Sequence, residues 1–151
     1  MIAVIQRVHY VKLRVEGHLV SQIGKGLLVL LGVSINDGEQ QAEWLARKIS
    51  QLRIISDEEG KMNRSVLDTG QEILVVSQFT LLADAAQGNR PSYIKAARPE
   101  QAIPLYKKVV SDLQIILGKK VPTGVFGADM QIEMVNDGPV TICLDTSVLM
   151  K

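Results

Sequence analysis

Two hydroxyl groups and an amide stand close together in the middle of the chain. Ser77, Gln78, Phe79 and Thr80 directly follow the apolar run 73–76, which has the length and composition of a buried strand. Polar groups at the carboxyl end of such a strand can face a ligand from a rigid support. In the alternative interpretation, Thr80 is an ordinary β-branched strand residue and Gln78 is a surface amide. Spacing alone leaves both interpretations open.

A second polar segment, Asn136-Asp137-Gly138-Pro139-Val140-Thr141, lies between two stretches of alternating hydrophobicity. Asn-Asp-Gly between alternating strands is typical of a tight hairpin, so we predict that the chain turns here. The bond from Gly138 to Pro139 is of the kind that can be cis at modest cost. A cis bond would aim two carbonyl oxygens in an unusual direction.

Three cations, Arg90, Lys95 and Arg98, gather in the stretch 84–98. Its lack of hydrophobic periodicity predicts a long surface connection. This connection could contact phosphates, and it could equally be a solvated loop. The net charge of +1 does not distinguish these two alternatives, because the molecule as a whole supplies almost no steering field for a polyanion.

Thiols and imidazoles are scarce, since the chain has one cysteine, Cys143, and two histidines, His9 and His18. A disulfide within the chain and a multi-thiolate metal site therefore cannot form, and most zinc sites and histidine-based triads lack their parts. We expect Cys143 to be an inert structural thiol. We also expect no bound metal and a cytoplasmic location.

The length of 151 residues suits one hydrophobic core, so residues 1–151 are predicted to form a single domain. The hydrophobic fraction of 46% and the charged fraction of 22% are ordinary for a globular protein. The longest apolar run, 27–33, is far too short to span a bilayer. We therefore expect a soluble protein with no membrane segment.

Two helices are predicted to support these groups. Apolar residues at steps of three and four indicate an amphipathic helix from Glu39 through Leu52. A second helix is expected from Pro99 to Leu117, with Gly118 as its stop. Pro104 conflicts with that helix, because it removes a backbone hydrogen bond, so we expect a late start or a bend there.

The strands are predicted from alternating or continuous apolar runs. The run 27–33 is expected to be buried on both faces, and 57–64 is expected to be a polar loop. Paired strands at both ends with two helices between them indicate an α/β fold with a mixed sheet. The remaining strands are expected at 1–8, 11–15, 19–23, 53–56, 73–76, 130–134 and 140–144.

Six segments together resemble the D-aminoacyl-tRNA deacylase family, and they extend over nearly the whole chain. The two signature motifs of that family match Ser77-Gln78-Phe79-Thr80-Leu81 and 136–141. Departures are minor: Tyr93 stands where phenylalanine is expected, and Pro104 interrupts a helix usually free of it. The other similar segments are 5–8, 59–63, 90–92 and 123–130.

This resemblance implies a homodimeric hydrolase that cuts the ester joining a D-amino acid to tRNA, without a cofactor. Each active site would combine Ser77 to Thr80 of one chain with a cis Gly138–Pro139 pair from the other. The carbonyls of that pair would hold the substrate's α-amino group and leave no room for an L side chain. Glycine has no side chain to exclude, so glycyl-tRNA is expected to be cleaved as well.

The resemblance also assigns substrate-binding roles outside the signature residues. Arg7 matches the residue that braces the Gly-Pro loop. Phe126 and Met130 match positions that line the pocket for the terminal adenosine, and Asn136 belongs to the same set of binding residues.

No base for a nucleophile is evident near Thr80 in the sequence, so we favour attack by water. The 2′-hydroxyl of the terminal ribose would assist the water, and the backbone N–H groups of Phe79 and Thr80 would stabilise the oxyanion. Direct attack by Thr80 is the alternative mechanism. An RNA-binding module without catalysis, and a relative that edits an L-amino acid, are the alternative functions.

Overall fold

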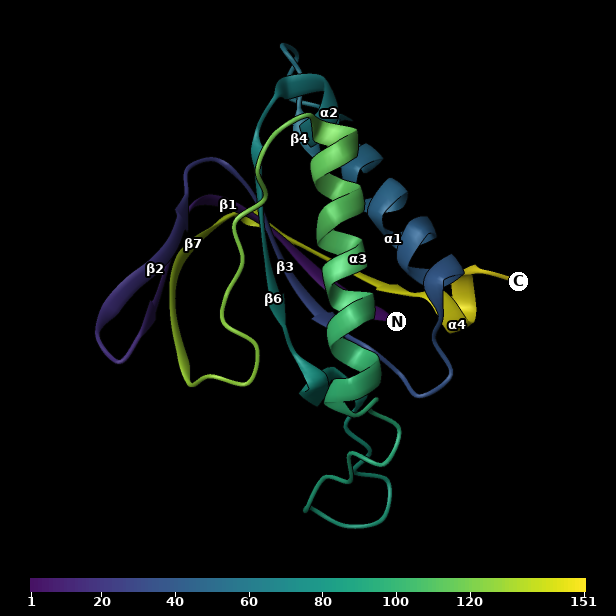
Figure 1. Cartoon of the computed structure of the whole chain (residues 1–151). Helices are drawn as coiled ribbons and strands as arrows, with labels where there is room; N and C mark the ends of the chain where they lie inside the picture. The colour runs from purple at the N-terminus through teal and green to yellow at the C-terminus, as the bar shows by residue number, and fades with distance from the viewer.

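A single long strand, β1 (Ile2–Val15), runs through the middle of the main sheet of the computed structural model, which describes residues 1–151 (Figure 1). Strand β7 (Met130–Asp145) pairs antiparallel with β1 along its length. On the other side, β3 (Gly26–Gly32) pairs with the first half of β1 and β2 (His18–Ile23) with the second half. Strand β6 (Glu72–Ser77) is parallel to β3, which confirms the prediction of a mixed sheet.

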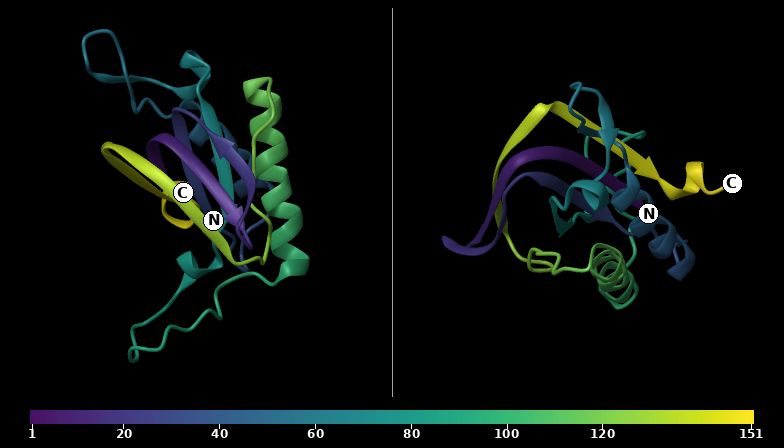
Figure 2. Two further views of the ribbon diagram at one scale, coloured as in Figure 1. Left: turned by 90° about the vertical axis from the view of Figure 1, so that its left-hand side faces the viewer. Right: turned by 90° about the horizontal axis from the view of Figure 1, so that it is seen from above.

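Strands β3 and β6 are buried on both faces. Leu27 and Leu31 belong to the larger core beneath the helices, whereas Leu28 and Leu74 belong to a smaller core on the opposite face. Side chains of a strand alternate between its faces, so a strand covered on both sides must be apolar throughout. The prediction of two-sided burial for 27–33 is confirmed. The smaller core fills the curl formed by β1 and β7, which curve together along their length (Figure 2).

Helices α1 (Glu39–Gln51) and α3 (Pro99–Leu117) lie side by side on one face of the sheet (Figure 1). The two helices were both predicted, and α1 ends one residue earlier than expected, with Leu52 as its C-cap. Buried side chains recur at helical spacing on each, so the apolar faces meet the larger core. No helix is both long enough and apolar enough to cross a membrane.

The expected late start of the second helix is wrong, because α3 begins at Pro99 and carries Pro104 inside it. Pro104 is exposed, so its ring sits on the solvent side of the helix. Burial of Leu105 and Tyr106 beside it stabilises the helical conformation and offsets one missing backbone hydrogen bond. At the other end, Gly118 takes a positive φ and donates to the carbonyl of Gln114, which ends the helix.

The expected polar loop at 57–64 is partly wrong, because its last residues form strand β5 (Met62–Arg64), which pairs with β4 (Ile55–Ser56). The Asp57 carboxylate accepts N–H groups of Glu59 and Lys61 and thereby closes the hairpin turn. These bonds also hold the pKa of Asp57 below its usual value. Two helices of four residues each, α2 (66–69) and α4 (146–149), were not predicted.

The predicted hairpin at 136–139 is wrong, because β7 continues through this segment without reversing. Asn136 pairs with Val8 and Thr141 with Gln6, both on the same strand β1. The residues 137–140 therefore face Arg7 alone and form a wide bulge, in which the extra residues leave the ladder. Asn-Asp-Gly serves a bulge as well as a turn, since both need a residue such as Gly138 with positive φ.

Candidate active site

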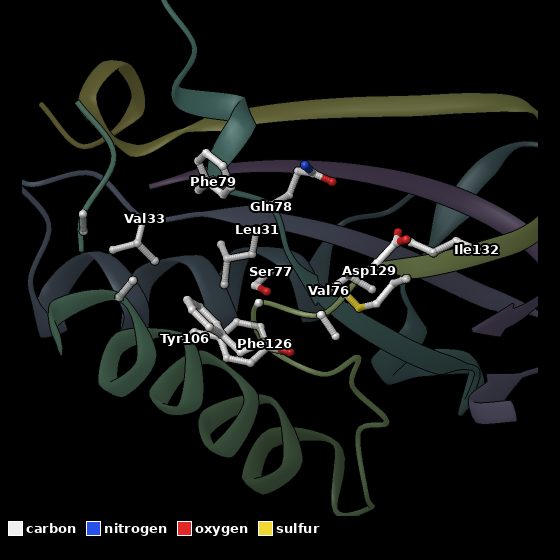
Figure 3. Close-up of a pocket in the computed structure, with 15 residues that line it drawn as sticks. Leu31, Val33, Val76, Ser77, Gln78, Phe79, Tyr106, Phe126, Asp129 and Ile132 are labelled. Atoms are coloured by element: carbon white, nitrogen blue, oxygen red, sulfur yellow. The ribbon is translucent and has the colours of Figure 1, made fainter. Parts of the chain in front are cut away.

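A cavity of about 310 Å³ opens between the end of β6, helix α3 and the segment before β7. Figure 3 shows Tyr106 and Phe126 side by side on one side of the cavity and Phe79 with Gln78 on the other. Most of its walls are apolar, and the polar groups are concentrated at Ser77, Gln78 and Asp129. The residues around the cavity are Leu31, Val33, Val76–Phe79, Ala97, Ala102, Tyr106, Phe126–Met130 and Ile132.

Tyr106 forms the floor of the cavity on the helix side, although nothing in the sequence analysis singled it out. Its hydroxyl donates to the buried carbonyl of Val75 at 3.0 Å, and its ring meets that of Phe126 at a centroid distance of 6.1 Å. Burial raises the pKa of Tyr106 to about 12, with an opposing hydrogen bond from Thr123. The phenol is therefore neutral at physiological pH and serves as an apolar wall. Its position four residues after the inward-facing Ala102 places it on the apolar face of α3, but this spacing is the same for a core residue and for a cavity residue.

Phe126 and Met130 line the cavity, and their role in binding the terminal adenosine stays a prediction. Met130 is the first residue of β7, so the strand that carries the bulge also supplies part of this wall. The Met130 sulfur lies where a side chain on Gly124 would have to be. The absence of a side chain at Gly124 thus lets the wall close.

The short 3-10 helix η1 (Phe79–Leu82) begins at the mouth of the cavity, directly after β6. Gln78 N–H donates to the Leu31 carbonyl at 2.8 Å, which anchors the turn on β3. A Cβ on Gly32 would lie 2.9 Å from the Gln78 carbonyl oxygen and 2.6 Å from Leu82 Cδ2. Glycine at position 32 is therefore required for this close packing, which sets the position of Phe79.

Thr80 lies beside the cavity and does not line it, in contrast to Ser77, Gln78 and Phe79. Its hydroxyl accepts a hydrogen bond from the Gln78 side-chain amide, which cannot act as a base. The first N–H groups of a helical turn, here those of Phe79 and Thr80, have no partner within the turn. The turn thus presents backbone donors near the cavity mouth and no activated nucleophile.

The bulge in β7 brings together the other residues that the sequence analysis had selected. Arg7 Nε lies 3.3 Å from the Asp137 carbonyl oxygen and 3.2 Å from its carboxylate, and Arg7 Nη1 donates to Ile54 O at 2.7 Å. Asn136 Oδ1 accepts the Val140 N–H at 3.2 Å across the base of the bulge. The side chains of Arg7 and Asn136 thus hold the shape of the bulge from its two sides.

The tip of the bulge consists of Gly138 and Pro139, which are exposed and joined by a cis peptide bond. Gly138 has φ +122°, and a Cβ there would lie 3.0 Å from Arg7 Nη2. Neither residue lines the cavity of its own chain. The predicted site residues therefore fall into two groups, one around the cavity and one at the bulge.

Comparisons with known proteins identify the family of the chain. The family model described as D-Tyr-tRNA(Tyr) deacylase matches residues 4–145. A D-aminoacyl-tRNA deacylase of Bacteroides thetaiotaomicron is 55% identical over 143 residues, which are 95% of each chain. Another, from Porphyromonas gingivalis, is 57% identical over 146 residues, or 97% of each chain.

Solved structures share the fold along nearly the whole chain. The structure named c-Myc DNA Unwinding Element Binding Protein superposes with a TM-score of 0.90 at 42% identity, covering 96% of this chain and 98% of that chain. A probable eukaryotic D-amino acid tRNA deacylase superposes with a TM-score of 0.82 at 15% identity, covering 95% and 97%. The second likeness is one of fold alone.

The fold, the cavity and these relatives define a hydrolase that acts on a carboxylic ester, with tRNA as the substrate class. The chain belongs to the D-Tyr-tRNA(Tyr) deacylase family, and its activity is that of a D-aminoacyl-tRNA deacylase.

Proposed function

We propose that each active site of this deacylase is completed by two copies of the chain in a homodimer. Each copy contributes one catalytic domain, residues 1–151, in the cytoplasm. One observation carries the proposal: the tip Gly138–Pro139 is exposed and held by Arg7 and Asn136, yet it lines no part of its own cavity. A braced and exposed backbone that lines no cavity of its own chain suits insertion into the cavity of a partner.

The cavity holds the terminal adenosine of the tRNA. Its apolar wall of Tyr106, Phe126 and Met130 suits a nucleobase, because single-stranded RNA is bound largely by stacking and apolar contact with unpaired bases. The mouth, at Ser77 to Thr80, then lies next to the ribose and its ester. This arrangement places the scissile bond beside the backbone donors of η1.

Hydrolysis proceeds by addition of water to the ester carbonyl, assisted by the 2′-hydroxyl of the terminal ribose. The N–H groups of Phe79 and Thr80 stabilise the oxyanion that forms, and loss of one such donor typically costs about 3 kcal/mol of transition-state stabilisation. Collapse of the intermediate breaks the bond to the ribose oxygen, which takes up a proton as the free D-amino acid and tRNA separate. Neither metal nor cofactor takes part.

The configuration at Cα is selected by backbone atoms of the bulge. The carbonyls at Gly138 and Pro139 bind the α-ammonium group of the substrate, and the surrounding main chain leaves space only for hydrogen where an L side chain would point. Many D-amino acids are accepted, because main-chain atoms do not read the identity of the side chain. Glycyl-tRNA is also accepted, because glycine has no side chain for the bulge to exclude.

An assay of D-tyrosyl-, L-tyrosyl- and glycyl-tRNA with purified protein tests this filter. We expect hydrolysis of the D-tyrosyl and glycyl esters and retention of the L-tyrosyl ester. Equal rates on the two tyrosyl esters would show that the bulge does not select configuration.

Complementation between defective subunits tests the shared site. Phe126→Asp places a charge in the cavity, and Gly138→Ala alters the bulge, so each variant alone is expected to be inactive. Co-expressed in equal amounts, they form heterodimers in which one site has both parts intact, and about a quarter of the wild-type activity returns. If the bulge served its own cavity, every site would contain a lesion and no activity would return.

Substitution of Thr80 distinguishes attack by water from covalent catalysis. The Thr80 hydroxyl has only the Gln78 amide as a partner, so Thr80→Ala is expected to keep kcat within about threefold of wild type. Single-turnover rate constants on D-tyrosyl-tRNA compare the chemical step in the variant with that in wild type. A loss of about a thousandfold or more would instead identify Thr80 as the nucleophile.

Nucleic-acid binding without hydrolysis is a second candidate, favoured by the name of the neighbour that superposes with a TM-score of 0.90. The net charge of +1 opposes strong general affinity for duplex DNA. A binding module would protect charged tRNA from hydrolysis, whereas the enzyme releases amino acid at catalytic concentration. Release of amino acid in large molar excess over protein therefore excludes this candidate.

A further inference from the structure

A second hollow of about 520 Å³ lies next to the active-site cavity, between the long connection 84–98, the start of α3 and the segment around Phe126. We call it the outer groove. Phe79, Ala97, Phe126 and Gly127 line both the cavity and the outer groove. The two hollows are therefore neighbours that share a wall, and a ligand that fills the cavity can continue into the groove.

The outer groove exposes an unusual amount of apolar side chain. Ile94 is 78% exposed and Phe79 is 56% exposed, while Tyr93 and Ile35 add to the same surface. The rings of Tyr93 and Phe79 meet edge to face at a centroid distance of 5.0 Å, which fixes the orientation of both. A contiguous apolar patch of this kind on a protein surface usually marks a binding site.

The charge at the rim of the groove is positive. Arg98 lines the groove, is exposed, and forms no ion pair or side-chain hydrogen bond in the structure. Lys95, close by in the chain, is already paired with Asp84 at 3.0 Å. No acidic residue lines the groove. The available guanidinium of Arg98 thus suits a ligand that combines an apolar face with an anionic group, as a nucleotide does.

We propose that the outer groove binds the nucleotide that precedes the terminal adenosine in the single-stranded 3′ end of the tRNA. Its base lies against Tyr93 and Ile94, and the phosphate that joins the two nucleotides lies near Arg98. The proposal rests on the proposed function, because the terminal adenosine must occupy the cavity for the preceding nucleotide to reach the groove. Binding energy gained here, remote from the ester, holds the ester at the mouth of the cavity.

Two minimal substrates separate the groove from the cavity. The D-tyrosyl ester of adenosine contains only the terminal nucleoside, whereas the D-tyrosyl ester of cytidylyl-adenosine adds the preceding nucleotide and one phosphate. We expect wild type to have a lower KM for the dinucleotide ester. That KM should also rise with salt concentration, because a phosphate contact releases counterions, whereas the KM of the adenosine ester should not.

Substitutions on the groove should affect only the dinucleotide ester. Ile94→Ser is expected to raise its KM about fivefold, because part of the apolar surface buried against the base is lost. Arg98→Gln is expected to remove most of the salt dependence. Matched controls exist: Ile115 is 76% exposed on the far part of α3, and Arg47 is an exposed arginine on α1. Ile115→Ser and Arg47→Gln should leave both substrates unaffected.

The outcomes distinguish failure of the proposed function from failure of the groove proposal. If wild type cleaves neither ester nor charged tRNA, the proposed function fails and the groove has no role as a subsite. If wild type cleaves both esters with the same KM, or Ile94→Ser affects them equally, the function stands and the groove proposal is overturned. A change in sedimentation on Ile94→Ser or Arg98→Gln would overturn it in favour of contact with a second copy of the chain.

Discussion

The cavity wall around Tyr106 and the bulge around Gly138 differ in the kind of atoms that they expose. The wall consists of side chains, held by the larger core and by the Tyr106 hydrogen bond to Val75. The bulge presents main-chain atoms on an exposed strand and depends on Arg7 for its shape. Side chains that pack in a core tolerate exchange of similar volume, whereas a backbone shape that needs one residue type does not. We therefore expect substitutions of Gly138 in the bulge to be far more damaging to activity than exchanges at the wall that conserve volume and apolar character.

The strongest test of this difference is Gly138→Ala. A Cβ at this position meets Arg7 Nη2 at 3.0 Å, and φ is +122°, where L side chains are strained. We expect kcat/KM on D-tyrosyl-tRNA to fall by about a hundredfold or more, because a displacement of the positioning backbone by about 1 Å is enough for such a loss.

Gly60→Ala is the matched control for that loss. Gly60 also has a positive φ, +77°, yet a Cβ there would have no neighbour within 4 Å. We expect it to lower the thermal midpoint slightly and to leave activity intact. Equal losses of activity in the two variants would mean that general destabilisation is responsible, and the contrast between wall and bulge would disappear.

A smaller effect is expected from Arg7→Lys. Lysine keeps the charge but lacks the planar fork that reaches Asp137 and Ile54 at once. We expect kcat/KM to fall about tenfold and the free energy of unfolding to fall by about 1 to 3 kcal/mol. Steady-state kinetics with chemical denaturation measures both, and unchanged activity would show that the bulge keeps its shape without the brace.

The smallest effect on activity is expected at the wall, from Tyr106→Phe. The exchange keeps the ring and removes the bond to Val75, so activity should stay within about twofold while the free energy of unfolding falls by about 1 kcal/mol. A large loss of activity at unchanged stability would instead assign the phenol a chemical role.

The same variant has a signature in alkaline solution. Folding raises the pKa of Tyr106 from 10.0 to about 12, chiefly through burial. The folded state therefore holds this proton more tightly, and the associated stability is complete below pH 10 and is lost as the pH rises toward 12. The free energy of unfolding, measured between about pH 10 and 12, should decline more steeply for wild type than for Tyr106→Phe. Parallel curves would contradict the burial of the phenol.

Much of the fold could be predicted from local sequence pattern. The continuous apolar run 27–33 indicated two-sided burial, and the helical spacing after Glu39 and after Pro99 indicated both long helices. The pattern failed where the outcome depends on distant partners. Two alternating stretches joined by Asn-Asp-Gly are compatible with a hairpin and with a bulge, and the partner strand β1, at the other end of the chain, selects the bulge. Neither the alternation of apolar residues nor the turn residues contain information about that pairing.

The site was predictable only in part and for a different reason. Ser77 to Thr80 has an ambiguous spacing, and only the resemblance to the deacylases gave these residues a role. The resemblance thus predicted the polar residues at the cavity mouth. It did not predict Tyr106, and neither did the sequence pattern, because a tyrosine on the apolar face of a helix has the same pattern whether it fills a core or lines a cavity. The exposed surface at Ile94 was equally hidden, since exposure depends on how the long connection folds back.

Strand β7 begins at Met130 in the wall of one cavity and continues to Gly138 at the tip of the bulge. The segment from Met130 to Gly138 therefore spans about 25 Å, at roughly 3.3 Å per residue. If the tip enters a second molecule, the spacing between the two reaction centres is set by the number of residues in 131–137. Adding or deleting two residues in that interval, which keeps each side chain on its face of the strand, would shift one centre relative to the other.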